Sequence, residues 1–138
     1  MTLGAAELLE RMSEVYPHFR GEDAFVIEHA APMLARVRMP VREHHVRVGG
    51  TVSGPAMFGL ADTALYTAIL ASVGWVPMTV TTNLSINFLS KPHPVDLVAD
   101  CRLLKLGRKL AVGEVYMRSI DSEAVVAHAT GTYAIPTR

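Results

Sequence analysis

Asp62 is the one charged residue in a long apolar segment of this chain, residues 54–77 (GPAMFGLADTALYTAILASVGWVP). Apolar side chains cover every face of the segment, which predicts a buried helix, and Asp62 is expected to be buried with it. A buried carboxylate is costly unless something compensates it. Asp62 therefore needs either a structural partner, such as Thr63 or Thr67, or a chemical task as a general base or nucleophile. The residues alone leave both interpretations open.

The helix is predicted to begin at Ser53-Gly54-Pro55, because Ser is a favoured N-cap residue and Pro fits the first turn. The backbone N–H of Gly54 then lies at the positive end of the helix dipole. Such a group can polarise a carbonyl and stabilise an oxyanion, whereas Pro55 has no N–H to offer. Taken alone, Ser-Gly-Pro is also typical of an ordinary helix start. Its spacing of eight residues from Asp62 favours the chemical interpretation.

Composition limits the class of protein. A chain of 138 residues suits one domain, with 13 basic and 13 acidic residues and therefore no net charge to attract a nucleic acid. The single cysteine, Cys101, excludes an intrachain disulfide and a cysteine-cluster metal site, and no spacing among the six histidines indicates a metal. The N-terminal residues form an amphipathic pattern and not a signal peptide, so a cytoplasmic protein is expected.

The segment 54–77 is long enough to cross a bilayer of about 30 Å. Its central Asp62, the lack of basic flanks and the strand patterns on both sides argue against insertion. No membrane partner is expected.

The flanking segments predict antiparallel strands at residues 25–30, 34–41, 79–88, 95–106, 110–120 and 124–135. In the third of these, Val80, Thr82, Leu84, Ile86 and Phe88 alternate with polar residues and should share the dry face. We expect an α+β fold with a sheet wrapped around one helix, in a single domain over 1–138. Residues 1–23 would form an amphipathic helix and lead-in, and residues 24–135 the core.

The order of these elements, with GLADTALYTA, NLSINFLSKP, KLGRK and VVAHATGTYAI, resembles the hotdog-fold acyl-CoA thioesterases of the PaaI-like, 4-hydroxybenzoyl-CoA thioesterase type. The similarity covers roughly residues 24–135. Gly50, Gly54 and the Leu60–Ala64 segment match that family's motif in register. Arg47 stands where Asn is usual, Ser53 where His is usual, and Pro55 where a second Gly is usual.

The resemblance implies roles for individual residues. Asp62 would be the nucleophile or general base on the thioester, acting across a dimer interface against Gly54 of the neighbouring subunit. Thr82 would help hold the carboxylate or the attacking water; a β-branched residue tolerated in a strand is the alternative. Arg47 and Ser53 would alter the mouth of the pocket, and Arg47 could also be a solvent-facing loop charge.

The apolar helix residues near Asp62 predict an acyl pocket that prefers a medium-chain or aryl group to acetyl. Lys91, Arg108 and Lys109 could bind the phosphates of coenzyme A, although each alone is more typical of a solvated turn. The predicted acyl-pocket residues are Met57, Phe58, Leu65, Tyr66 and Ile69.

Two functions follow from the resemblance. The first is a cofactor-free hydrolase that converts an acyl-CoA to free acid and CoA. The second is a non-catalytic hotdog protein that binds an acyl-CoA or acyl-carrier ligand. The strand over residues 79–88 would leave an open sheet edge, so a homodimer, or a dimer of dimers that forms a homotetramer, is expected.

Overall fold

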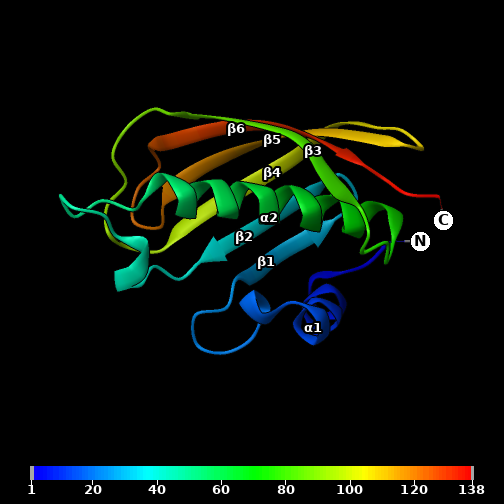
Figure 1. Cartoon of the computed structure of the whole chain (residues 1–138), viewed down its shortest axis with the longest axis horizontal. Coiled ribbons are helices and arrows are strands. Elements are labelled where there is room, and N and C mark those ends of the chain that lie inside the picture. The colour runs from blue at the N-terminus through cyan, green and yellow to red at the C-terminus, as the bar shows by residue number, and fades with distance from the viewer. Residues whose placement is uncertain (1, 138) are drawn as a thin grey trace.

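A single long helix lies in the concave face of one antiparallel sheet (Figure 1). The computed structural model describes residues 2–137. Its elements in chain order are α1 (Ala5–Val15), η1 (Pro17–Phe19), β1 (Val26–Ala31), β2 (Leu34–Met39), η2 (Glu43–His45), α2 (Gly54–Val73), β3 (Val80–Phe88), β4 (Leu97–Leu106), β5 (Leu110–Ser119) and β6 (Val125–Ala134).

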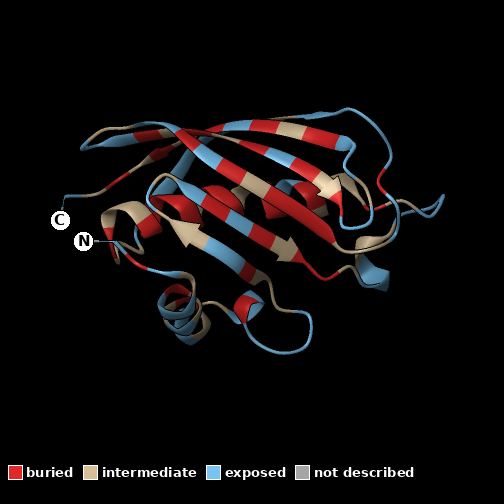
Figure 2. Ribbon diagram, turned by 180° about the vertical axis from the view of Figure 1, so that it is seen from behind, coloured by how far each residue is buried: buried red, intermediate tan, exposed pale blue. Residues whose placement is uncertain are grey.

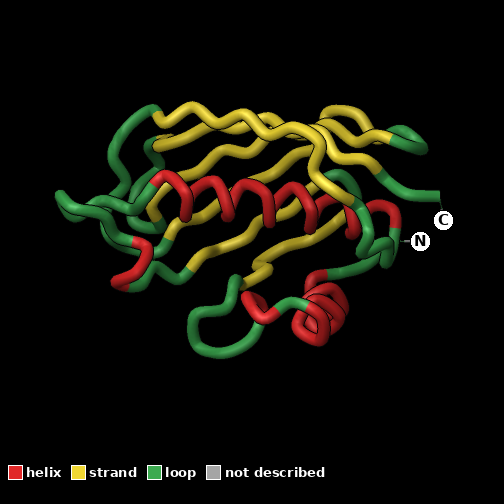
Figure 3. Tube along the Cα trace, in the orientation of Figure 1, coloured by secondary structure: helices red, strands yellow, loops and turns green. Residues whose placement is uncertain are grey.

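The six strands have the order β1-β2-β4-β5-β6-β3, and every neighbouring pair is antiparallel. The chain leaves β2, forms α2 and returns as β3 beside β6, so β3 becomes an edge strand. Figure 3 shows how the strands curl over the helix. The predicted α+β hotdog fold is confirmed.

Helix α2 begins and ends for identifiable local reasons. The Ser53 side chain accepts a hydrogen bond from the backbone N–H of Ala56 at 3.3 Å, as expected for an N-cap. The helix ends at Val73, before the predicted Pro77, because Gly74 adopts a φ of 98° that breaks the helical backbone. Among residues 2–137, α2 alone is long and apolar enough to span a membrane, but here it forms the core under the sheet.

Two glycines on adjacent strands let α2 lie close to the sheet. Gly113 of β5 pairs with Gly131 of β6, and both lie beneath Leu65. A Cβ atom added at Gly113 would be 2.7 Å from Leu65 Cδ2, and one at Gly131 would be 2.8 Å from Leu65 Cδ1. Leu65 therefore packs into space that any other residue at these two positions would fill.

The N-terminal segment packs against the open side of α2, where it forms a second apolar cluster (Figure 2). Leu8, Met12 and Phe19 are buried against Leu70 and Ala71 of α2. The predicted lead-in is thus part of the folded structure beside the helix.

Strand β3 contains a bulge that changes which residues face the helix. Thr81 pairs with Tyr133 and Asn83 with Thr132, so Thr82 is the extra residue of the bulge. After the bulge, Leu84 and Ile86 pack against the core, as predicted. Before it, Thr81 and not Thr82 faces α2, because one inserted residue reverses the alternation.

Candidate active site

Asp62 is held by hydroxyl groups from two strands. The Thr81 hydroxyl donates to Asp62 Oδ1 at 2.7 Å, and the Tyr133 hydroxyl donates to the same oxygen and also lies 2.8 Å from the Asp62 carbonyl oxygen. The residue is half-buried and not fully buried as predicted. Within residues 2–137, Oδ2 has no hydrogen-bond partner, so one carboxylate oxygen is anchored while the other is unpaired.

The interpretation of Thr82 as the partner of Asp62 is wrong. The Thr82 hydroxyl donates to the Thr132 carbonyl oxygen at 3.1 Å, away from the carboxylate. The prediction assumed unbroken alternation along the strand, and the bulge places Thr81 in the expected position instead.

Tyr133 is a site residue that the sequence analysis missed. Its ring is 1% exposed, and burial followed by its bond to Asp62 raises the pKa of its hydroxyl, which therefore stays a donor. A signal was present in the alternation of Ala127, Ala129, Gly131 and Tyr133, which places Tyr133 on the inner face of β6.

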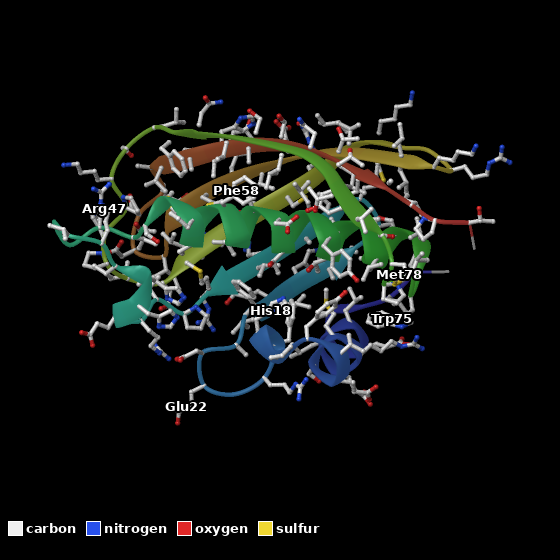
Figure 4. The ribbon with its side chains drawn as sticks, in the orientation of Figure 1. His18, Glu22, Arg47, Phe58, Trp75 and Met78 are labelled. Atoms are coloured by element: carbon white, nitrogen blue, oxygen red, sulfur yellow. The ribbon has the colours of Figure 1, made fainter. Side chains whose placement is uncertain are left out.

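A cavity of about 380 Å³ opens beside Asp62, and we call it the Asp62 cavity. Strand and helix residues form one side, while the segment around η1 forms the other. His18 lies on this second side, below the middle of α2 in Figure 4. The lining residues are Tyr16, His18, Phe19, Asp62, Thr63, Tyr66, Thr79, Val80, Thr81 and Tyr133.

A second cavity, of about 400 Å³, lies at the N-terminus of α2 and is called the Gly54 cavity. Arg47, labelled in Figure 4, lines it together with Lys91 and Gly54. Phe88 covers Gly54 closely, because a Cβ atom on Gly54 would be 3.4 Å from Phe88 Cζ. A helix N-terminus with two cations can bind an anionic group or polarise a carbonyl.

The other predicted site residues are dispersed. Arg108 and Lys109 line a third cavity, of about 410 Å³, near the C-terminal end of the described chain. Ser53 serves as the N-cap of α2. Among residues 2–137, no group of His, Cys, Asp or Glu side chains is arranged to hold a metal ion.

The predicted acyl-pocket residues do not gather around Asp62. Met57, Leu65 and Ile69 are buried in the core, and Phe58 is 41% exposed. Only Tyr66 lines the Asp62 cavity. For Leu65 and Ile69 the prediction was wrong, because Asp62 lies at the edge of the buried face of α2 and these two side chains point into the core. For Phe58, which is exposed, and Met57, which lines the Gly54 cavity, it stays a prediction.

Comparisons with known proteins agree with this fold. The sequence model of the thioesterase superfamily matches residues 49–126, while no protein of curated function matches the sequence. A candidate thioesterase from Silicibacter sp. TM1040 is 44% identical with a TM-score of 0.86, over 99% of this chain and 94% of that one.

Two more distant structures share the fold. Zebrafish thioesterase superfamily member 2 is 22% identical with a TM-score of 0.82, over 98% of this chain and all of that one (100%). A variant of the phenylacetic acid degradation protein PaaI from Thermus thermophilus is 23% identical with a TM-score of 0.72, over 92% of this chain and 99% of that one.

Proposed function

Since this chain belongs to the thioesterase superfamily and is a hotdog-fold, PaaI-like thioester hydrolase, we propose that it converts a medium-chain or aryl acyl-CoA to the free acid and CoA. The supporting observation is the Asp62 carboxylate, which has one oxygen anchored by Thr81 and Tyr133 and the other unpaired beside a cavity. The reaction requires water and no cofactor.

Asp62 has the chemistry that the reaction needs. The two hydroxyl donors stabilise the negative charge on Oδ1 and fix the orientation of the carboxylate. Oδ2 can then take a proton from a water molecule that attacks the thioester, or attack the carbonyl carbon directly. In both routes the carbonyl oxygen becomes an oxyanion, and the bond to the CoA sulfur breaks as CoA leaves as a thiolate that takes up a proton. Direct attack leaves a mixed anhydride on Asp62, which water then hydrolyses to the free acid and the carboxylate.

The oxyanion needs a donor, and we assign this role to the Gly54 N–H at the start of α2. Asp62 cannot use the Gly54 of its own chain, because eight residues of α-helix separate them by about 12 Å. The site therefore requires two subunits.

The contacts of β3 support a specific dimer. Thr81 lies against Asp62 and Phe88 lies against Gly54, so β3 runs past both groups in the direction opposite to α2. Antiparallel pairing of β3 with a second copy, centred on Ser85 and with Thr82 again the extra residue of the bulge, would place Phe88 of the partner subunit opposite Thr81. Gly54 of the partner subunit would then approach Asp62, giving two equivalent sites in the dimer.

The exposed surface of β3 is consistent with this pairing. Val80 and Phe88 are 54% and 53% exposed, and Phe58 of α2 adds to the apolar surface at the same edge. An edge strand with exposed apolar residues promotes aggregation, and proteins normally cover such a strand. A second copy of β3 would cover it and satisfy the free backbone groups.

The overall reaction is tested by measuring thiol release from acetyl-, hexanoyl-, phenylacetyl- and succinyl-CoA. We expect phenylacetyl- and hexanoyl-CoA to have the highest kcat/KM, because Tyr16, Phe19 and Tyr66 give the Asp62 cavity a large apolar area. Absence of hydrolysis with every substrate would favour the ligand-binding alternative. Fastest turnover of acetyl-CoA would contradict the proposed acyl group.

Thr81 and Thr82 provide a matched pair of variants. Thr81→Val should lower kcat about tenfold, because it removes one hydrogen bond to the charged carboxylate while keeping the side-chain shape. Thr82→Val should change kcat less than about twofold, because Thr82 bonds only to a carbonyl. Steady-state kinetics at saturating substrate checks both, and equal losses would reject the role of Thr81.

A further inference from the structure

The wall of the Asp62 cavity formed by the N-terminal segment is held in place by hydrogen bonds. The Tyr16 and Tyr66 hydroxyls are 2.8 Å apart, and Tyr66 donates to the Pro77 carbonyl oxygen, also at 2.8 Å. The backbone N–H of Phe25 donates to the His18 carbonyl oxygen at 3.1 Å. These bonds fix the position of His18 relative to α2.

The His18 imidazole is surrounded on one side and open on the other. Its ring centroid is 5.3 Å from that of Tyr16, 4.9 Å from that of Phe19 and 5.6 Å from that of Phe25. The side chain still exposes much of its surface and lines the Asp62 cavity. Within residues 2–137, neither ring nitrogen has a hydrogen-bond partner, so both can bind a ligand.

The remaining polar side chains of the cavity have little donor capacity left. Thr63 donates to Gly59, and the Thr79 oxygen is closed off from solvent without a partner. The other hydroxyls donate within the protein, and these belong to Tyr16, Tyr66, Thr81 and Tyr133. If Asp62 serves the reaction, His18 is the accessible group left to donate a hydrogen bond to a polar feature of the acyl chain.

The charge of the cavity restricts what that feature can be. Desolvation by its aromatic neighbours lowers the pKa of His18, and the Asp62 charge opposes this only in part. The imidazole is therefore mainly neutral at pH 7, with one donor and one acceptor nitrogen. An acyl carboxylate would meet the negative charge of Asp62 without a compensating cation among the lining residues.

We infer that His18 is a specificity-determining residue that binds a neutral hydrogen-bonding substituent of the acyl group, such as a hydroxyl or keto group. This inference rests on the proposed function, because it places the acyl group in the Asp62 cavity. The N-terminal segment, which lies outside the central helix and sheet, would then determine whether the enzyme prefers substituted or unsubstituted acyl groups.

The test uses matched substrates that differ by one hydroxyl, hexanoyl- against 6-hydroxyhexanoyl-CoA and phenylacetyl- against 4-hydroxyphenylacetyl-CoA. We expect the wild type to prefer at least one hydroxylated member by about threefold to tenfold in kcat/KM. His18→Phe keeps a flat ring against its aromatic neighbours but removes both nitrogens, and should abolish the preference. His18→Gln should restore part of it.

The control is His29→Phe, the same substitution on a residue that does not line the Asp62 cavity, and it should leave the preference unchanged. No preference in the wild type, or one unaffected by His18→Phe, would overturn the inference. Equal loss of kcat on all substrates in His18→Phe would also overturn it, since His18 would then act on the reaction itself.

Binding measurements test this inference independently of the proposed hydrolysis. Thioether analogues of the same acyl-CoA pairs cannot be hydrolysed, and calorimetry gives their Kd values directly. A His18-dependent preference in Kd, without hydrolysis of any thioester, would support the inference while rejecting the hydrolase. Hydrolysis without a His18-dependent preference in either measurement would do the reverse.

Discussion

Asp62→Asn is expected to lower kcat/KM at least about a hundredfold, because the amide can neither take a proton from water nor attack a carbonyl. The amide oxygen can still accept from Thr81 and Tyr133, so the local structure should persist. Thiol release measured under single-turnover conditions separates this chemical loss from any change in product release.

The Kd for a thioether analogue should change only slightly in Asp62→Asn, and the thermal unfolding midpoint should stay close to that of the wild type. Near-normal turnover would mean that the carboxylate is structural, as its hydrogen bonds to two strands would also allow. A large fall in stability together with activity would point to the same conclusion.

Gly54→Pro is expected to lower kcat by about a hundredfold to a thousandfold, because it removes the N–H assigned to the oxyanion. Proline is well tolerated at the first position of a helix, and Ser53 already has the extended backbone, φ −71° and ψ 153°, that a residue before proline needs. Gly54→Ala is the matched control. It keeps the N–H and adds a methyl group in ordinary contact with Phe88, so its activity should remain.

Mixing the two inactive variants tests whether the site spans two chains. In a mixed dimer, Asp62 of the Gly54→Pro chain meets the unaltered Gly54 of the Asp62→Asn chain, and one of the two sites is complete. Random exchange of subunits makes half of the dimers mixed, so about a quarter of wild-type activity should return. No recovery after verified exchange would show that each chain acts alone.

The fold could be predicted from sequence because its signals are local and strong. The apolar segment around Asp62 reads as a buried helix, with Ser53 and Pro55 marking its start. Alternating strands follow, and the helix carries apolar side chains on every face. A helix that is apolar on every face must be buried, and a sheet wrapped around it is the simplest way to bury it.

The site was predicted only in part, because two of its features depend on tertiary structure. The bulge at Thr82 comes from pairing with β6, and no turn residue in β3 marks it. The prediction therefore assumed an unbroken alternation along the strand. The cavity wall comes from His18 and its neighbours, about forty residues from Asp62 in sequence. A helical pattern can identify the residues beside Asp62 on α2, but not the segment that packs across from it.

The distance between α2 and the sheet depends on the glycine pair, Gly113 and Gly131, beneath Leu65. Leu65 lies one turn from Asp62, so raising the helix at Leu65 would also raise the carboxylate relative to Thr81 and Tyr133. An alanine at Gly131 would place one methyl group 2.8 Å from Leu65 Cδ1 and push Leu65 away from the sheet. Neither glycine lines the Asp62 cavity, yet the size of the residue at these two sheet positions would thus set how closely Asp62 approaches Thr81 and Tyr133.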